Sequence, residues 1–406
     1  MTFKVIYHMI KITKDNSDEF NVHTKKMIPD LIEDKKEHLN QMEENSINKI
    51  LEFIETNPTN RYIVSHSGGK DSSITYAIWL KAIEKLKIVN RSLYNNLNWE
   101  IAFFNTSNET ADTYKYIKQN LPKDKLNIIN PDMGFYQWII NVKNYFVPSV
   151  FFRNCCTKFK EKQMFENYEC DENIIMVTGL RKYESFKRSK YDYVMDYEKR
   201  KEIHGVNNIP KNLTIFAPVV EWEDTDVWLY LIKNKIPVNK QYYYGFNRTG
   251  CLICPFQNDY IDILTKKYYP THWKRWEELL KVNHEYYKIG ERLKWSVDEW
   301  IEGKWKQAKS REQLIVMNKP NAKNIKELAE VKGISEELAA KYFHKKCECG
   351  KNLNPTEVAV NLKFYGRNMI EDKMECKKCF MNSNDMKRQD YKEMVWNFVN
   401  DGCKLF

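Results

Sequence analysis

The 406-residue chain has no apolar run near the length of a membrane span, and its N-terminus lacks the apolar core of a signal peptide. We therefore expect a cytoplasmic protein with no membrane partner. Disulfides are not expected either, although there are ten cysteines, because the cytosol keeps thiols reduced. Eight of them form closely spaced sets, which favours metal ligation: Cys155-Cys156, Cys251-x-x-Cys254, Cys347-x-Cys349 and Cys376-x-x-Cys379. Cys170 and Cys403 are left over.

The composition has no extreme that would exclude a folded protein. Charged residues make up 30% of the chain and aromatic residues 14%. The net charge of +10 indicates a mild preference for anionic partners, which alone does not establish nucleic-acid binding. The length allows two or three domains with a sizeable core.

The Walker A spacing is also missing, yet another phosphate-binding pattern is present. An apolar run at 62–64 precedes a loop with two adjacent glycines, and a helical apolar pattern follows at 74–80. Glycines let backbone amides approach an anion, the hydroxyls and Lys70 add donors, and the helix N-terminus is positive. We therefore predict nucleotide phosphates at Ser67, Gly68, Gly69, Lys70, Asp71 and Ser72. The alternative is a Gly-Gly turn in an unrelated α/β protein.

Strand and helix patterns alternate through the first half of the chain, after a charged segment with a predicted helix at 27–39. This alternation predicts an α/β fold with a parallel sheet covered on both faces and ligands at the carboxyl ends of the strands. The predicted strands lie at 62–64, 99–104, 126–129, 174–177 and 215–220. The predicted helices lie at 47–54, 74–80, 110–119, 135–146 and 224–233, the last capped by Asp224.

Two polar segments follow predicted strands. The segment 105–110 suits a ribose or base edge, with Asn105 and Glu109 as candidates, although a helix cap made by Ser107 or Asn108 explains it equally. The second segment places Gly179, Arg181, Glu184 and Arg188 after a strand. Two arginines with a glutamate between them make an anion clamp. A solvated helix start is the alternative.

The first two cysteine pairs supply four thiolates, from Cys155, Cys156, Cys251 and Cys254. Four thiolates can hold Zn or a 4Fe-4S cluster, and spacing alone does not distinguish the two. A buried structural pair at Cys155 and Cys156 is the alternative.

The joint order of these motifs resembles the phosphoadenosine phosphosulfate (PAPS) reductase family of the PP-loop ATP pyrophosphatase superfamily, over roughly residues 47–260. Further matching segments are 218–222 leading to 226–228, 236–239 and 250–255. The resemblance implies a Rossmann-like, adenine nucleotide alpha hydrolase-like sheet. In the cluster-bearing branch it also implies a 4Fe-4S cluster on Cys155, Cys156, Cys251 and Cys254, with catalytic roles for Lys70, Asp71, Arg181 and Arg188.

Two departures from the reductases bear on the activity. Reductases generally have a degraded phosphate loop, whereas residues 67–72 keep the pattern of ATP-consuming relatives. The chain also lacks the Glu-Cys-Gly-Leu-His tail that carries the reductase nucleophile, and Cys403 is only a loose echo of it. The hypothesis is therefore an ATP- and Mg-dependent sulfur transfer onto a nucleic acid, tRNA or DNA, served by a sulfur or electron donor protein. A sulfonucleotide reductase and a non-catalytic nucleotide- or nucleic-acid-binding component are the rivals.

Beyond the family match, the chain changes character. Five tryptophans between 273 and 305 indicate a helical core, and residues 325–340 resemble a helix-hairpin-helix, for which an ordinary connector is the alternative. Cys347, Cys349, Cys376 and Cys379 indicate a zinc-ribbon-like module. Residues 301–406 carry 21 Lys or Arg and 15 Asp or Glu, so they hold +6 of the net charge, which favours a nucleic-acid-contacting tail.

The predicted organisation has five parts: an N-terminal extension at 1–45, the nucleotide-binding domain at 46–240, a cysteine-pair and aromatic helical region at 241–310, the hairpin at 311–345, and the zinc-ribbon-like module at 346–406.

Overall fold

The computed structural model describes residues 28–168, 173–186, 188–204, 211–307, 309–318, 320–343, 345–366, 373–400, 403 and 405. The chain divides into two compact units. The first unit comprises Met1–Asn144 and Phe152–Arg275, and the second comprises Tyr145–Phe151 and Trp276–Phe406. The second cysteine pair therefore lies in the nucleotide-binding unit, while most of the tryptophan-rich helices share a unit with the C-terminal cysteines. Among the described residues, no helix has the length and apolar character needed to span a bilayer.

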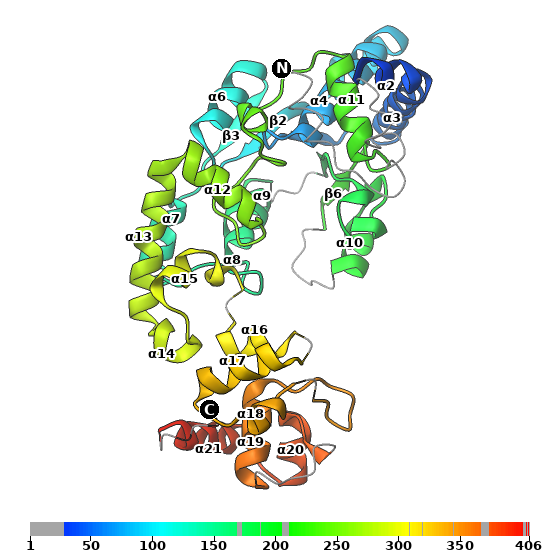
Figure 1. Ribbon diagram of the computed structural model, residues 1–406. Helices are drawn as coiled ribbons and strands as arrows, with labels where there is room; N and C mark the ends of the chain where they lie inside the picture. The colour runs from blue at the N-terminus through cyan, green and yellow to red at the C-terminus, as the bar shows by residue number, and fades with distance from the viewer. Residues whose placement is uncertain are drawn as a thin grey trace. The chain divides into compact units, whose positions relative to one another are not determined.

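One six-stranded sheet forms the centre of the first unit, in the order β3-β2-β1-β4-β6-β5 (Figure 1). The strands are β1 (Arg61–Ser65), β2 (Trp99–Phe104), β3 (Leu126–Ile129), β4 (Ile174–Val177), β5 (Val194–Met195) and β6 (Leu213–Phe216). Neighbours pair in parallel except β5, which pairs antiparallel with β6. The predicted parallel α/β sheet is confirmed, and the two-residue antiparallel edge strand is an addition that its short pattern could not reveal.

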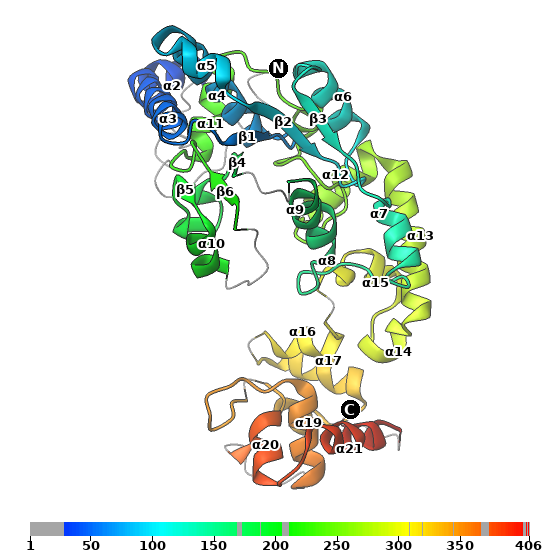
Figure 2. The same ribbon diagram turned by 180° about the vertical axis from the view of Figure 1, so that it is seen from behind.

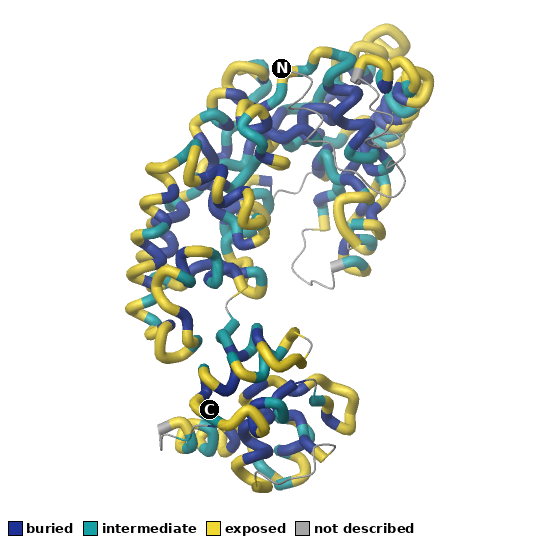
Figure 3. The backbone as a smooth tube through the Cα atoms, in the orientation of Figure 1, coloured by how far each residue is buried: buried dark blue, intermediate teal, exposed yellow. Residues whose placement is uncertain are grey.

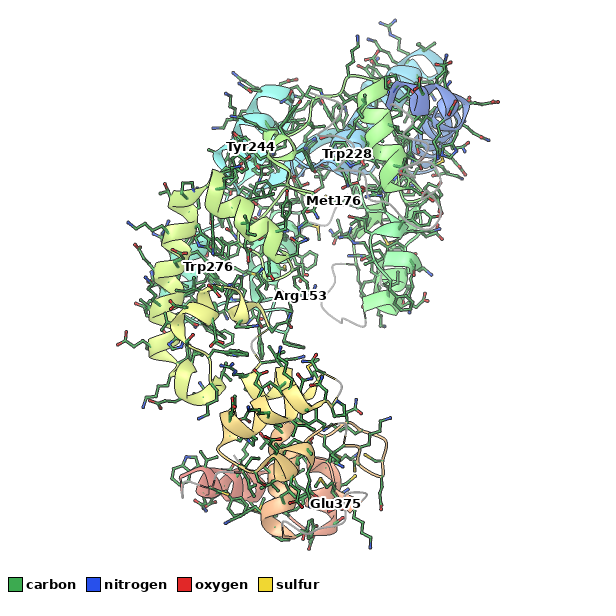
Figure 4. The ribbon with its side chains drawn as sticks, viewed as in Figure 1. Arg153, Met176, Trp228, Tyr244, Trp276 and Glu375 are labelled. Atoms are coloured by element: carbon green, nitrogen blue, oxygen red, sulfur yellow. The ribbon has the colours of Figure 1, made fainter. Side chains whose placement is uncertain are left out.

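The strands are buried on both faces because their apolar residues point alternately to opposite sides. On one face Tyr62 and Val64 join a core built with α3, α4 and α11. On the other face Ile63 and Met176 pack against α9. Helix α9 can be seen in Figure 2, and Figure 4 labels Met176 on β4. Figure 3 shows that the central strands are buried, whereas the surrounding helices carry exposed residues.

Helices in the first unit follow most of the predicted periodicity. They are α2 (Ile28–Asp34), α3 (Lys36–Thr56), α4 (Lys70–Val89), α5 (Arg91–Asn96), α6 (Ala111–Asn120), α7 (Phe135–Asn141), α8 (Asn154–Cys156), α9 (Lys162–Tyr168), α10 (Tyr197–His204), α11 (Asp224–Lys233) and α12 (Asp259–Tyr268), with α13 (Pro270–Tyr286) continuing beyond Arg275. Short helical turns are η1 (Thr157–Glu161), η2 (Lys182–Glu184), η3 (Arg188–Lys190) and η4 (Lys240–Tyr244).

Several predicted boundaries were wrong. The strand predicted at 215–220 ends at Phe216, because the next residues turn back with Val220 N–H donating to Ala217 O. The helix predicted at 135–146 ends at Asn141, before Asn144 and Tyr145, which both have positive φ. The N-terminal residues 1–27 lie outside the described residues.

The described part of the second unit is helical. Its remaining elements are α14 (Ile289–Leu293), α15 (Val297–Ile301), η5 (Lys304–Lys306), α16 (Arg311–Val316), α17 (Ala322–Lys332), α18 (Glu336–Ala340), α19 (Pro355–Phe364), α20 (Lys377–Ser383) and α21 (Arg388–Asn400). Trp276 and Trp305 are almost fully buried, and their rings pack edge to face with 4.9 Å between the ring centroids. Trp295 and Trp300 are buried here too, and Trp273 in the first unit. The tryptophans therefore form core, as predicted, and not an exposed stacking surface.

Candidate functional site

The predicted phosphate loop lies between β1 and α4, at the carboxyl end of a central strand. Gly68 has φ +79°, a conformation that favours glycine. A Cβ at Gly69 would lie 3.0 Å from Thr249 Oγ1, so a second glycine keeps this turn close to the 249–255 segment. Gly69 also caps α4, a 20-residue helix whose first-turn N–H groups have no intrahelical partner. The loop therefore presents the positive end of a long helix to any anion there.

Buried side chains hold this loop in place. Gly68 N–H donates to His66 Nδ1 at 3.1 Å, and Lys70 N–H donates to Tyr242 Oη at 2.9 Å. Ser72 and Ser73 both donate to Gly69 O at 2.9 Å. Burial lowers the pKa of His66 to about 3, so its imidazole is neutral and Nδ1 can accept. The roles of His66 and Tyr242 could not be predicted from the sequence, because they depend on side-chain contacts with the backbone of the loop.

Lys70 does not line the cavity described below. It belongs instead to a charge set of two cations and two carboxylates that contact one another. Its Nζ lies 2.9 Å from Asp71 Oδ2 and 2.8 Å from Asp224 Oδ1. Arg181 also contacts both carboxylates, through Nε at 2.7 Å and Nη2 at 2.8 Å. Two cations and two carboxylates thus cancel, and the two cationic side chains are almost fully buried. Lys70 is thus paired with carboxylates in this structure, and its role at a nucleotide phosphate stays a prediction.

Asp224 was predicted to cap α11, and the structure corrects this. The cap is Glu223, whose N–H donates to Asp226 Oδ2 at 3.0 Å. The carboxylate of Asp224 is instead committed to Lys70 and Arg181. Burial alone would raise the pKa of Asp224, but these two cations lower it below its usual 3.8.

Gly179, predicted to bind the cofactor, allows two backbone segments to meet. A Cβ there would lie 2.5 Å from Asp71 O and 2.9 Å from Ser72 N, which is closer than any side-chain carbon tolerates. The chain after β4 therefore packs directly on the first turn of α4. This contact explains why a glycine ends the strand and brings the arginine segment to the phosphate loop.

The predicted anion clamp is divided between two places. Arg181 N–H donates to Glu184 Oε2 at 3.3 Å, and Arg188 forms an ion pair with Glu184. Glu184 and Arg188 line the cavity described below, whereas Arg181 lies in the closed charge set behind the loop. Lys187 lies outside the described residues.

The segment 105–110 supports the cysteines. Asn108 accepts from Ile253 N–H at 3.3 Å, donates through Nδ2 to Ile253 O at 2.8 Å, and its carbonyl accepts from Leu252 N–H at 2.6 Å. The helix cap predicted at Ser107 or Asn108 is in fact Thr110, which accepts from Thr113 N–H. Ser107 instead accepts from Phe135 N–H at 2.6 Å.

Asn105 and Glu109, the ribose candidates, have partners inside the protein. Glu109 accepts from Thr106 N–H at 3.1 Å and from Thr106 Oγ1 at 2.5 Å. Asn105 donates to Asn130 and accepts from Ser107 N–H and Tyr114 Oη. Neither residue lines the cavity, whereas Thr106 and Asn108 do. Their role in nucleotide binding stays a prediction.

A cavity of about 470 Å³ joins the phosphate loop to the first two cysteine pairs. Its lining includes Ser67, Gly69, Asp71 and Ser72 from the loop and Cys155, Cys156, Cys251 and Cys254 from the pairs. Thr178 also lines it, and the buried Oγ1 of this residue has no partner among the described residues. Predicted site residues that are far apart in the sequence thus line the same cavity.

The four cavity thiols have a cationic setting. Hydrogen bonding from Cys155 lowers the pKa of Cys156 to about 6, while burial raises that of Cys251. Arg248 Nη2 donates to Cys254 Sγ at 3.3 Å. The charges of Cys251 and its neighbours raise the pKa of Lys160. Neither Arg248 nor Lys160 was predicted as a site residue. The position of Lys160 follows from the rare π-helical turn η1, which contains it.

The described cysteines of the second unit are not part of this cavity's lining. Cys347, Cys349, Cys376 and Cys379 converge, with all four sulfurs within 4.8 Å of one another, as predicted for a metal site. Cys403 packs against the apolar core of the second unit. Cys170 lies outside the described residues.

The combination of a Gly-Gly loop at the carboxyl edge of a Rossmann-like sheet defines a nucleotide-binding α/β protein. Residues 61–257 match the phosphoadenosine phosphosulfate reductase domain. The match lies within the region in which the motif order predicted this resemblance.

The chain is also similar to individual proteins. An uncharacterized protein of Methanocaldococcus jannaschii is 31% identical over 56% of this chain and 43% of its own length. An adenosine 5'-phosphosulfate reductase of Oceanobacillus iheyensis is 25% identical over 46% of this chain and 72% of its own. The crystal structure of the PAPS reductase from Candida auris in a phosphate complex has a TM-score of 0.35 and 13% identity, over 53% of this chain and 94% of that one. The chain thus spans less than half of the first relative.

Proposed function

We propose that this protein binds ATP at the phosphate loop, releases pyrophosphate, and transfers sulfur to a nucleic acid. The observation that carries the proposal is that one cavity is lined both by the intact loop and by four thiols. A nucleotide phosphate at Ser67, Gly69 and Ser72 would therefore lie in the same space as a thiolate-bound group. The unpartnered hydroxyl of Thr178 is a further sign that this space receives a polar ligand.

In the proposed reaction, an oxygen of the acceptor attacks the α-phosphorus of ATP and the bond to the β-phosphate breaks. Pyrophosphate leaves along Gly68 and Gly69, with Mg as its counter-ion. Lys70 pairs with two carboxylates and does not line the cavity, whereas Arg188 lines it and, among the described residues, pairs with Glu184 alone. Arg188 and the first-turn amides of α4 are therefore the donors best placed for the leaving charge. A sulfur nucleophile from a donor protein then displaces AMP.

The donor set of the cavity fits a 4Fe-4S cluster, which would supply electrons or hold sulfur. Four thiols face the space, and Arg248 and Lys160 offset the negative charge of thiolates. Among the residues described, the close group of four cysteine sulfurs is the C-terminal one, and the four cavity thiols are not part of it.

Anaerobically purified protein should therefore be brown, with about four irons per chain. Cys251→Ser should bleach it and stop sulfur transfer, yet leave ATP binding intact, because the phosphate loop uses none of the thiols. Pyrophosphate release from ATP, with and without tRNA or DNA, tests the first step. A colourless preparation that contains zinc and no iron would contradict the cluster.

A sulfonucleotide reductase is the second candidate, supported by the names of the relatives. It predicts sulfite release from PAPS or APS without ATP, and its loss in Cys403→Ser. Sulfite release without ATP would therefore overturn our proposal. ATP binding without any turnover would instead support a non-catalytic component of a larger complex.

The nucleic-acid acceptor is proposed from the second unit. Helices α17 and α18 meet at Gly333, with φ +63°, in the predicted hairpin, and Lys323 and Lys326 are exposed on α17. Lysines on such a surface displace counter-ions from phosphates. The paired change Lys323→Glu and Lys326→Glu should weaken tRNA or DNA binding and flatten its salt dependence, whereas Lys115→Glu on α6 should not. Equal binding by all three proteins would exclude the hairpin as the contact.

A further inference from the structure

The four C-terminal cysteines have the spacing of ligands to one metal ion. All four sulfurs lie within 4.8 Å of one another, and Cys349 Sγ lies 3.7 Å from Cys376 Sγ. A tetrahedron with Zn–S bonds of about 2.3 Å has edges of about 3.8 Å. The observed separation matches this edge and leaves no room for several irons and sulfides between the thiolates.

Glu357 on α19 ties the two ligand-bearing segments together. It is only 3% exposed, and its Oε1 accepts from Lys377 N–H at 2.9 Å and from Lys351 Nζ at 3.0 Å. Lys377 directly follows Cys376, and the carbonyl of Lys351 accepts from Cys347 N–H at 2.9 Å. The second oxygen, Oε2, accepts from Asn354 N–H at 3.0 Å. One buried carboxylate therefore fixes a neighbour of each cysteine pair.

The ligands are also part of the apolar core of the second unit. Cys347 and Cys376 are buried in one cluster with Leu328 of α17 and Leu338 of α18, against which Cys379 packs. The hairpin helices and the cysteines thus share a core. In addition, Lys332 of α17 forms a buried ion pair of 3.0 Å with Glu312 of α16.

We propose that Cys347, Cys349, Cys376 and Cys379 bind one structural zinc ion, that Glu357 is the positioning residue for both ligand pairs, and that this ion completes the core on which the α17–α18 hairpin depends. Zinc is favoured over ferrous iron because thiolates bind it more tightly and its closed shell accepts the tetrahedral geometry. A small module gains its folding free energy from such an ion. This inference does not depend on the activity proposed for the cavity.

The test uses the full-length chain, purified anaerobically without chelator. The double variant Cys349→Ser and Cys379→Ser should contain about one zinc per chain less than the wild type, with the same iron content. Glu357→Gln should lower zinc affinity about 10- to 100-fold in competition with a chromophoric chelator. Excess zinc should raise its thermal transition, whereas a defect of packing alone would lower the transition without changing the zinc affinity.

Glu330→Gln, an exposed carboxylate on α17, is the matched control and should bind zinc as the wild type does. Lys351→Met removes one contact of Glu357 and should lower zinc affinity less, in case Glu357→Gln does not fold. Iron lost from the double variant in place of zinc would overturn the metal assignment. Unchanged zinc affinity in both Glu357→Gln and Lys351→Met would overturn the positioning role.

Discussion

Gly179→Ala is the sharpest test of how the site is built. The added Cβ would lie 2.5 Å from Asp71 O and 2.6 Å from Asp71 C, both backbone atoms at the start of α4. Neither atom is the end of a flexible side chain, so the strand end or the helix must move. Overpacking of this kind costs about 1–3 kcal/mol.

For a unit of this size that cost corresponds to a fall in Tm of roughly 2–12 °C. The movement also displaces the first-turn amides that face the cavity. ATP affinity should therefore fall about tenfold or more, equivalent to about 1.4 kcal/mol. Calorimetric unfolding and isothermal titration with ATP measure the two effects on one preparation.

Gly134→Ala provides the control in the same unit. A Cβ there would meet Ser107 Oγ at 3.6 Å and Gln137 Oε1 at 3.7 Å, which is ordinary contact. Its Tm and ATP affinity should stay close to wild type. If Gly179→Ala behaved like this control in both measurements, the close approach of β4 and α4 would not be what fixes the phosphate loop.

Two further predictions concern pH. Asp224→Asn leaves Lys70 and Arg181 with one carboxylate and should lower the free energy of unfolding by about 3 kcal/mol near pH 7. Because the folded pKa of Asp224 is lowered, the difference in Tm from wild type should persist above about pH 5 and vanish as pH falls below 3.8. A difference in Tm that is unchanged at low pH would contradict the charge set. His66 has a folded pKa of about 3 against an ordinary 6.5, so the unfolded state gains the proton first and stability should fall by about 1.4 kcal/mol per pH unit below 6.5, about 2 kcal/mol at pH 5. His66→Gln should flatten the dependence of Tm on pH between 7 and 5, and an equal slope in both proteins would show that His66 is not the group responsible.

Periodicity and motif order predicted the sheet, its central strands and the family, because these depend on local patterns of apolar residues and glycines. The convergence of Cys347, Cys349, Cys376 and Cys379 was predictable from spacing for the same reason. The pairing of Lys70 with Asp224 was not predictable, since the two residues are distant in the sequence. A lysine in such a loop can point either toward a ligand or toward carboxylates of the protein. Arg248 and Tyr242 were missed because their approach to the cavity depends on the path of the chain after α11.

The hydrogen bonds that Asn108 makes with Leu252 and Ile253 have a consequence for how a cofactor would be inserted. They hold the turn that bears Cys251 and Cys254 against the segment that follows β2. Cys251 and Cys254 are therefore positioned by the protein itself, and Cys155 and Cys156 are likewise held in helix α8. A metal centre of the kind proposed for this cavity would then meet four thiols that the fold already positions, which lowers the entropic cost of its assembly.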